Sequence, residues 1–242
     1  MPTVEVNGIR IYYEAHGKGE PLVIIAGLSI DLTALEGVVS QLSERYRVIA
    51  FDNRGTGRSD KPDIPYSVEM MADDTAGLLD ALKVARAHIM GISLGGRIAI
   101  TLTLKRPELV KSLILVSTAA KVPNTLSRRL LFLLLEIPRR VGALSKKYPQ
   151  PYYAYLRQRK ASQNYDPTDR LHEIRAPTLV LHATKDRLVP YKLAENMHAE
   201  IVGSKMVTFK GGHMFLFFRQ KEFLKAVEDF LELQNSESPR SG

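Results

Sequence analysis

Three polar side chains in this sequence are of the types that nucleophilic catalysis needs. Ser93 lies at the centre of Gly-Ile-Ser-Leu-Gly, Asp186 in "ATKDRLVP" and His213 in "KGGHMF". A hydroxyl is a weak nucleophile until a base takes its proton, and a histidine base needs a third group that fixes its tautomer. The three residues therefore predict acyl transfer, with Ser93 as nucleophile, His213 as base and Asp186 as orienting acid.

Each of these residues also has an ordinary structural alternative. A serine between glycines can simply form a turn, and an aspartate often caps a helix or a turn. His213 competes with five other histidines. His88 lies inside a predicted strand and His182 near the end of another, whereas three have polar, surface-like surroundings: His16, His172 and His198.

A metal site is a further alternative. His182, Asp186 and His213 could surround an ion, but their spacing is not that of zinc sites. The chain has no cysteine, which excludes disulfides, a thiolate nucleophile and a cysteine-ligated metal. We therefore expect neither a metal nor an organic cofactor.

The elements that must position the three residues alternate between strand and helix. Strand-like runs occur at residues 3–17, 21–27, 47–52, 86–90, 110–118, 176–183 and 204–209. Helical patterns occur at residues 31–43, 68–82, 94–107, 191–198 and 221–233. This alternation predicts an α/β fold with a mostly parallel twisted sheet and helices on both faces. A hairpin turning at Asn7-Gly8 should add antiparallel edge strands.

Ser93 falls between the strand at residues 86–90 and a helix that starts at Leu94. A serine on so tight a turn has a strained backbone, and its crowded neighbours Gly91 and Gly95 must be small. The helix N-terminus that follows can stabilise negative charge. Asp186 and His213 each follow a later strand, and the order Ser, Asp, His is typical of one fold.

On these motifs the chain resembles the α/β-hydrolase superfamily, especially its small esterases, enol-lactonases and cofactor-free haloperoxidases. The resemblance rests on "GISLGG", "FDNRGTGRSD", "TKDRLVP" and "GGH", which occur in the family's order. It implies an oxyanion hole formed by the backbone N–H groups of Leu28 and Leu94. The chain departs from the family at Ala26-Gly27, where many relatives have His-Gly. What braces this loop, and whether the Ser29 hydroxyl helps, is left open.

A second group of residues resembles the family's D-x-R-G-x-G-x-S turn. We expect these residues to build the turn beneath the site and not to take part in chemistry: Asp52, Arg54, Gly55, Gly57 and Ser59.

The resemblance implies a serine carboxylesterase that acts on small esters with short to medium acyl chains. Serine in place of aspartate at position 93 argues against epoxide hydrolases and dehalogenases. An enol-lactonase, a carbon–carbon bond hydrolase and a haloperoxidase-like perhydrolase remain open. A non-catalytic ligand receptor on the same fold is the alternative from another class, and it would turn over its ligand barely or once.

The domain organisation follows from where the alternation is interrupted. Residues 1–119 and 170–233 should form the hydrolase core, residues 120–169 a helical lid, and residues 234–242 a disordered tail. The lid segment "SRRLLFLLLEIPRR" is apolar between basic margins, as expected for the roof of an acyl pocket.

The positive charge of the chain is concentrated in this lid. Residues 121–160 contain ten Lys or Arg and one acid, so the rest of the chain is nearly neutral and does not indicate nucleic-acid binding. A weak contact between the basic lid and an anionic membrane is conceivable. The N-terminus lacks a signal pattern and no apolar run is long enough to span a membrane, so we expect a cytoplasmic location. The oligomeric state is open.

Overall fold

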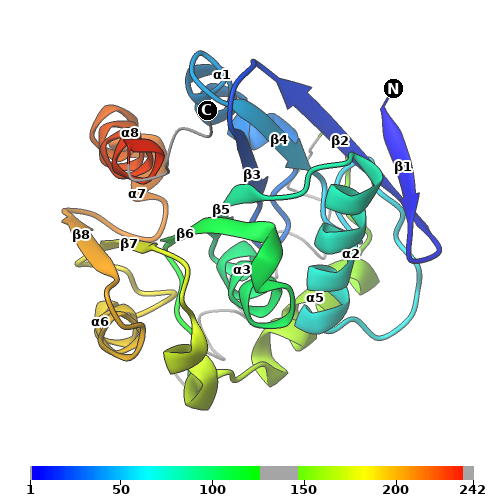
Figure 1. Ribbon diagram of the computed structural model, residues 1–242. Coiled ribbons are helices and arrows are strands. Elements are labelled where there is room, and N and C mark those ends of the chain that lie inside the picture. Colours follow the sequence, from blue (N-terminus) through cyan, green and yellow to red (C-terminus); the bar gives the residue numbers. More distant parts are fainter. Residues whose placement is uncertain (1, 126–146, 237–242) are drawn as a thin grey trace.

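An eight-stranded sheet lies between two layers of helices in the computed structural model, which describes residues 2–125 and 147–236 (Figure 1). The strand order is β1-β2-β4-β3-β5-β6-β7-β8. The strands are β1 (Thr3–Val6), β2 (Ile9–His16), β3 (Pro21–Ile25), β4 (Arg47–Phe51), β5 (Ala87–Ile92), β6 (Val110–Val116), β7 (Thr178–Ala183) and β8 (Lys205–Phe209). The predicted α/β architecture is confirmed.

The sheet is antiparallel only at its N-terminal edge. β1 and β2 form the predicted hairpin, and its turn residues Asn7 and Gly8 have φ values of +50° and +73°. β2 pairs antiparallel with β4, whereas every following pair is parallel. The carboxyl ends of the parallel strands therefore share one edge, where ligand sites of such sheets form.

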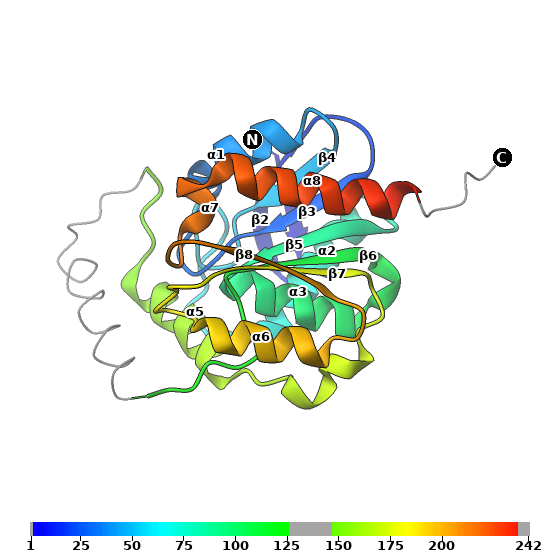
Figure 2. The same cartoon turned by 90° about the vertical axis from the view of Figure 1, so that its left-hand side faces the viewer.

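The helices cover both faces of the sheet (Figure 2). The α-helices are α1 (Glu36–Leu42), α2 (Val68–Ala81), α3 (Leu94–Lys105), α5 (Tyr152–Asn164), α6 (Tyr191–Glu200), α7 (Phe215–Phe218) and α8 (Gln220–Ser236). The 3-10 helices are η1 (Leu32–Leu35), η2 (Pro107–Leu109) and η3 (Thr168–Glu173). Residues of α2, α3 and α6 share one hydrophobic cluster with the sheet, and residues of α1, α7 and α8 share the other.

The central strands are mostly apolar because both of their faces are covered, and they include a few buried polar residues such as His88, Ser112 and His182. All residues of β5 and β7 are buried, and β6 has only Lys111 partly exposed. Without outward-facing polar positions these strands show no alternation, which is the pattern expected of a parallel sheet with helices on both faces.

Two boundaries differ from the sequence-based expectation. The predicted disordered tail is wrong for Gln234, Asn235 and Ser236, which continue α8. Lys111 Nζ donates a 2.9 Å hydrogen bond to Asn235 Oδ1, so a tertiary contact extends the helix beyond its apolar run. The helix expected at residues 31–43 begins as the 3-10 helix η1, whose start is capped by Asp31. Residues 237–242 lie outside the described residues.

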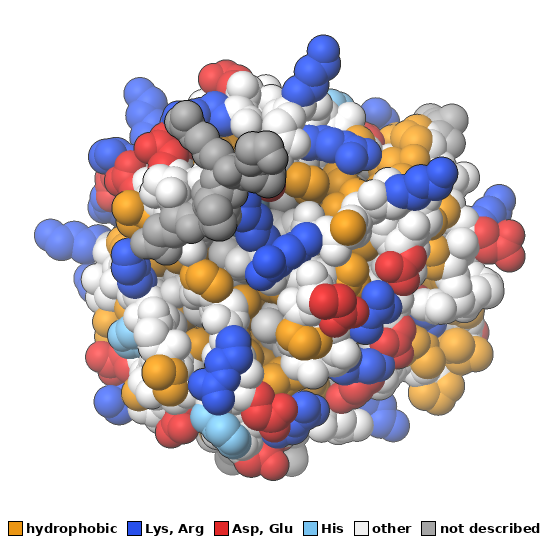
Figure 3. All heavy atoms as spheres, in the orientation of Figure 1, with side chains coloured by type: hydrophobic (Ala, Val, Ile, Leu, Met, Phe, Trp, Pro, Cys, Tyr) orange, Lys and Arg blue, Asp and Glu red, His pale blue; other side chains and the backbone are white. Residues whose placement is uncertain are grey.

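The surface carries both signs of charge. On the face seen in Figure 3, acidic and basic side chains are interspersed. Many of the cations are paired, as in the contacts of Arg10 with Asp60 and Lys225 with Asp229. Among the described helices, none combines the length and apolar character needed to cross a bilayer.

His88 is a buried histidine within the sheet, as its place in a strand predicted. Its Nδ1 lies 2.7 Å from Ser112 Oγ on the neighbouring strand, and its side chain is fully buried. Burial, with the nearby positive charge of Lys111, lowers the pKa of His88 from 6.5 to about 4. The folded protein therefore holds His88 in its neutral form.

We expect His88 to make the protein acid-sensitive between pH 6.5 and 4. In this range His88 binds a proton in the unfolded chain but not in the folded protein. The free energy of unfolding is therefore highest above pH 6.5 and falls as the pH drops. A shift of this size corresponds to about 3 kcal/mol. Urea unfolding at pH 7.5 and 4.5 should show that the free energy of unfolding falls less between these pH values in His88→Gln than in wild type. Exposed His172→Gln serves as the control, and equal losses in all three proteins would contradict the assignment.

Candidate active site

Ser93 occupies a sharp turn between β5 and α3. Its φ and ψ are +55° and −111°, a region that non-glycine residues rarely adopt. The turn is held because Ser93 N–H donates a 2.8 Å hydrogen bond to the Val116 carbonyl at the end of β6. A Cβ at Gly91 would overlap the Gly95 carbonyl, and one at Gly95 would overlap the Ile25 carbonyl. The two glycines therefore allow strand and helix to approach closely on either side of the serine.

The three residues singled out in the sequence meet at the carboxyl edge of the sheet. His213 Nε2 lies 3.1 Å from Ser93 Oγ, and His213 Nδ1 lies 2.7 Å from Asp186 Oδ2. Ser93 follows β5, Asp186 follows β7, and His213 lies in the loop after β8. The side chains of Ser93, His213 and Asp186 are thus in hydrogen-bonding order, at distances over which a proton can pass from a serine to a histidine.

Asp186 is the most tightly held member of the three. Its Oδ1 accepts hydrogen bonds from the N–H groups of Leu188 (2.8 Å) and Val189 (2.9 Å). Burial alone would raise the pKa of the Asp186 carboxyl, but contacts with His182 and His213, together with the Val189 N–H, hold it well below its usual range. Asp186 is therefore an anion throughout the neutral range, as an orienting acid must be.

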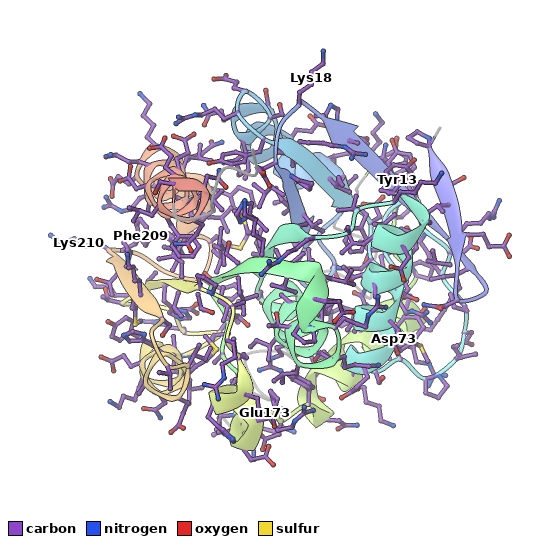
Figure 4. All side chains as sticks on the ribbon, viewed as in Figure 1. Tyr13, Lys18, Asp73, Glu173, Phe209 and Lys210 are labelled. Carbon is purple, nitrogen blue, oxygen red and sulfur yellow. The ribbon has the colours of Figure 1, made fainter. Side chains whose placement is uncertain are left out.

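The loop that carries His213 is fixed at both ends. Ser117 Oγ, at the end of β6, donates a 2.8 Å hydrogen bond to the His213 carbonyl. Before the histidine, buried Phe209 stacks on Phe215 with ring centroids 4.4 Å apart. The neighbouring Lys210 extends outward at the rim of the molecule (Figure 4). Packing of Phe209 and Phe215 therefore anchors a glycine-rich loop whose other side is open to solvent.

The predicted oxyanion donors Leu28 and Leu94 line the same pocket as Ser93. Leu94 is the first residue of α3, so its N–H belongs to the helix N-terminus. Within the described parts of the chain, neither N–H donates a hydrogen bond. The loop that contains Leu28 is braced at Ala26, whose carbonyl accepts a 2.9 Å hydrogen bond from Asn53 Nδ2. The role of these two amides as oxyanion donors stays a prediction.

The turn after β4, which contains Asp52 and Arg54, is held by buried polar contacts. Buried Asp52 accepts hydrogen bonds of 2.8 Å from the N–H groups of Leu32 and Arg58. Arg54 forms a buried ion pair with Asp74, with Nη2 2.6 Å from Oδ1. These contacts join the turn to η1 and α2, and the side chains of Asp52 and Arg54 are absent from the pocket lining.

An apolar pocket of about 300 Å³ opens over Ser93. Most of its lining comes from the loop after β3, the segment after Asp186, α5 and α7. The lining residues are Gly27, Leu28, Ile30, Leu35, Ile92, Ser93, Leu94, Tyr155, Ser162, Leu188, Val189, His213, Met214, Leu216 and Phe217. Among these described residues no Asp, Glu, Lys or Arg side chain occurs, so the pocket suits an uncharged, apolar group.

Part of the predicted lid contributes to this pocket. α5 supplies Tyr155 and Ser162 to the lining. The segment predicted as the pocket roof, residues 127–140 with their apolar run at residues 130–135, lies outside the described residues. The boundaries of the lid and its proposed contact with lipid stay predictions.

No set of three His, Cys, Asp or Glu side chains in the described ranges is arranged to hold a metal ion. His182 does approach Asp186, with Nε2 3.4 Å from Oδ2, but it also lies 2.9 Å from the Val189 carbonyl. A histidine that donates to a carbonyl has no lone pair there for a metal.

Sequence reasoning missed several residues that hold the site. His182 was expected near the end of a strand, in a core or sheet-edge role, and it contacts the Asp186 carboxylate. Thr118 Oγ1 donates a 2.7 Å hydrogen bond to the Ser93 carbonyl, as Ser117 does to that of His213. The sequence contained a signal for Ser117 and Thr118. Both are polar residues at the end of the predicted strand that becomes β6, and β6 pairs with β5, which leads to Ser93.

Comparison with known proteins agrees with this architecture. A family model described as "alpha/beta hydrolase fold" matches residues 20–149, and one described as "TAP-like protein" matches residues 152–242. A protein of Azorhizobium caulinodans named putative carbamate hydrolase RutD is 30% identical, with the match covering 89% of this chain and 92% of the relative.

Comparison with solved structures likewise finds hydrolases of similar fold. The enol-lactonase from Burkholderia xenovorans LB400 has a TM-score of 0.83 at 26% identity, over 96% of this chain and all of that one. Est816, described as an N-acyl homoserine lactone degrading enzyme, has a TM-score of 0.82 at 28% identity, over 95% and 100% of the two chains. The esterase EaEST from Exiguobacterium antarcticum has a TM-score of 0.84 at 25% identity, over 95% and 98%.

Proposed function

Because the chain belongs to the α/β-hydrolase family, we propose that it hydrolyses carboxylic esters with uncharged acyl groups of short to medium length. The observation that carries this proposal is the hydrogen-bonded series Ser93, His213 and Asp186 at the mouth of an apolar pocket. Serine is the nucleophile of an acyl-enzyme mechanism in this proposal, and no step requires a metal or an organic cofactor.

In the proposed reaction, Ser93 Oγ attacks the ester carbonyl carbon while His213 Nε2 takes its proton. Asp186 orients the imidazole through Nδ1 and stabilises its charged form. The oxyanion accepts hydrogen bonds from the N–H groups of Leu28 and Leu94, each worth about 3–4 kcal/mol in comparable sites. His213 then protonates the leaving alcohol, and water releases the acid by the same steps.

The lining of the pocket favours a substrate with an apolar acyl group over one with a small polar group. Leu28, Leu188 and Met214 are representative of its lining, which offers few polar partners besides Ser93 and His213. A carbamate would present polar groups to this lining, and unpaired polar groups are costly to bury. We therefore favour esters over the carbamates that the names of several relatives suggest.

We expect chain-length selectivity on p-nitrophenyl esters. Each methylene buried in the pocket contributes about 0.8 kcal/mol, or roughly fourfold in kcat/KM, until the pocket is full. Activity should rise from acetate to butyrate and hexanoate, and should fall for palmitate, which exceeds a pocket of about 300 Å³. Steady-state kinetics on this series test the proposal, with Ser93→Ala as the blank. A flat profile, or one that is highest for acetate, would contradict the assignment of the pocket to the acyl group.

Lactones are a second candidate class, because they are cyclic esters and undergo the same attack. Two similar structures carry such a description, an enol-lactonase and an N-acyl homoserine lactone degrading enzyme. The apolar lining could hold the acyl chain of a neutral lactone as well as that of an open ester. Comparing kcat/KM for N-octanoyl homoserine lactone with that for p-nitrophenyl octanoate separates the two classes.

A further inference from the structure

Two glutamine side chains hold the loop that carries the Leu28 amide. Gln158 lies on the buried face of α5, and Gln150 lies just before that helix. Ser29 N–H donates a 3.4 Å hydrogen bond to Gln158 Oε1, and Ser29 Oγ donates to Gln150 Oε1. The residue after Leu28 is therefore fixed through its backbone and its side chain by residues that are distant in the sequence.

Gln158 is completely buried, and both polar atoms of its amide are paired. Its Nε2 donates hydrogen bonds to the Arg54 carbonyl (2.7 Å) and to Thr56 Oγ1 (2.8 Å). Its Oε1 also accepts a 3.1 Å hydrogen bond from Gln150 Nε2. One side chain thus joins α5, the turn after β4 and the loop after β3. A position that requires a donor and an acceptor together suits an amide and excludes leucine and glutamate.

Gln150 reinforces this arrangement from a partly exposed position. Its Nε2 donates a 2.8 Å hydrogen bond to the Gly55 carbonyl, while its Oε1 accepts from Ser29. Both glutamines therefore connect Ser29 to the same turn, which is itself fixed by the buried Arg54–Asp74 ion pair. The support of the loop therefore includes buried residues of the core.

Ser29 needs such support because its backbone conformation is uncommon. Its φ is +61°, in the left-handed region, which costs a non-glycine residue about 1 kcal/mol or more. Such a conformation persists only where the surroundings determine it. The Gly27–Leu28 peptide unit, which carries the Leu28 N–H, is held by a 3.1 Å hydrogen bond from Ile30 N–H to the Gly27 carbonyl. If Ser29 relaxed, this turn would open and the Leu28 N–H would no longer be held in one orientation.

We infer that Gln158 is a positioning residue for the oxyanion hole, which acts through Ser29 to aim the Leu28 N–H, with Gln150 as its partner. The inference rests on the proposed function, because an oxyanion forms only if Ser93 attacks a carbonyl group. Oxyanion donors contribute to catalysis when they are directed in advance at the site where charge develops. These two glutamines supply the bracing of a loop that has Ala26-Gly27 at its start.

A positioning role differs measurably from a purely structural one. Donors that act mainly on the tetrahedral intermediate affect kcat and leave substrate binding nearly unchanged. Loss of one whole donor costs about 100- to 1,000-fold in comparable sites, so misdirection of the Leu28 N–H should cost roughly 10- to 100-fold. A residue that only stabilises the fold would lower the folded fraction without changing kcat per folded molecule.

The test compares Gln158→Met and Gln150→Met with Gln163→Met. The last variant makes the same substitution on α5 at a partly buried position outside the catalytic pocket. For each protein, kcat and KM on p-nitrophenyl butyrate are measured per folded molecule, with the folded fraction taken from urea unfolding. Affinity is measured for a trifluoromethyl ketone with a butyl chain, whose adduct with Ser93 carries an oxyanion.

We expect kcat to fall about 10- to 100-fold in Gln158→Met, with KM within about twofold of wild type. Gln150→Met should show a smaller loss in the same direction, and Gln163→Met none. Affinity for the ketone should fall in parallel with kcat. Gln150→Met decides the question if Gln158→Met does not fold.

Unchanged kcat and ketone affinity in the folded glutamine variants, beside an active wild type, would overturn the inference and leave the proposed function intact. Equal falls in all three variants would also overturn it. A wild-type protein that neither turns over the ester nor binds the ketone would contradict the proposed function itself, and the inference with it.

Discussion

Ser93→Ala should abolish ester hydrolysis while the protein remains folded. Without Oγ no acyl enzyme can form, and the residual rate comes only from the oxyanion hole and from substrate binding. In comparable triads the loss of the serine costs on the order of a millionfold in kcat. Alanine tolerates the unusual φ of residue 93 about as well as serine does, so the turn and the surrounding pocket should persist. The measurement is kcat on p-nitrophenyl butyrate with the same enzyme preparation checked by circular dichroism.

Ser40→Ala is the matched control for this variant, because Ser40 is an exposed serine on α1 that takes no part in the site. It should retain wild-type turnover. Activity of Ser93→Ala within tenfold of wild type would show that another residue, or a contaminating esterase, performs the reaction.

Asp186→Asn should lower kcat by about a thousandfold or more with little change in the fold. An amide at this position can present an N–H to His213 Nδ1, which favours the wrong imidazole tautomer and removes the charge that stabilises the protonated ring. The carboxylate is completely buried and also accepts two backbone N–H groups, so no solvent can replace its charge. The measurement is kcat across pH 6 to 9, compared with wild type.

Asp229→Asn removes an exposed carboxylate on α8 and serves as the control for this substitution. It should leave kcat unchanged at every pH. If Asp186→Asn were nearly as active as wild type, the orienting acid would have to be sought elsewhere, and the role assigned to the residue after β7 would be wrong.

The fold and the three central residues could be predicted from the sequence because their signals are local. Gly91 and Gly95 flank Ser93 two residues away on each side, so the sequence itself marks the turn, although the backbone that crowds Gly95 comes from the end of β3. The apolar strands and the Asn7-Gly8 hairpin follow from the periodicity of short segments. Asp186 and His213 each come directly after a predicted strand, so the parallel topology alone places them at the same edge as Ser93.

The support of the site could not be predicted, because it depends on contacts between distant segments. Ser29 and Gln158 are 129 residues apart, and no local pattern distinguishes Gln158 from Gln163, the other glutamine of α5. The contact of His182 with Asp186 depends on the path of the chain after β7. The helical conformation of Asn235 at the end of α8 likewise depends on Lys111 of strand β6.

Covalent labelling tests the central claim most directly. Wild-type protein is treated with an excess of a p-nitrophenyl alkylphosphonate, and the residual activity, the intact mass and the modified peptide are determined together. The account predicts one phosphonyl group per chain, located on Ser93, with activity lost in proportion to labelling and no adduct in Ser93→Ala. An adduct on a different residue, or full ester turnover by protein that is fully labelled at Ser93, would contradict it.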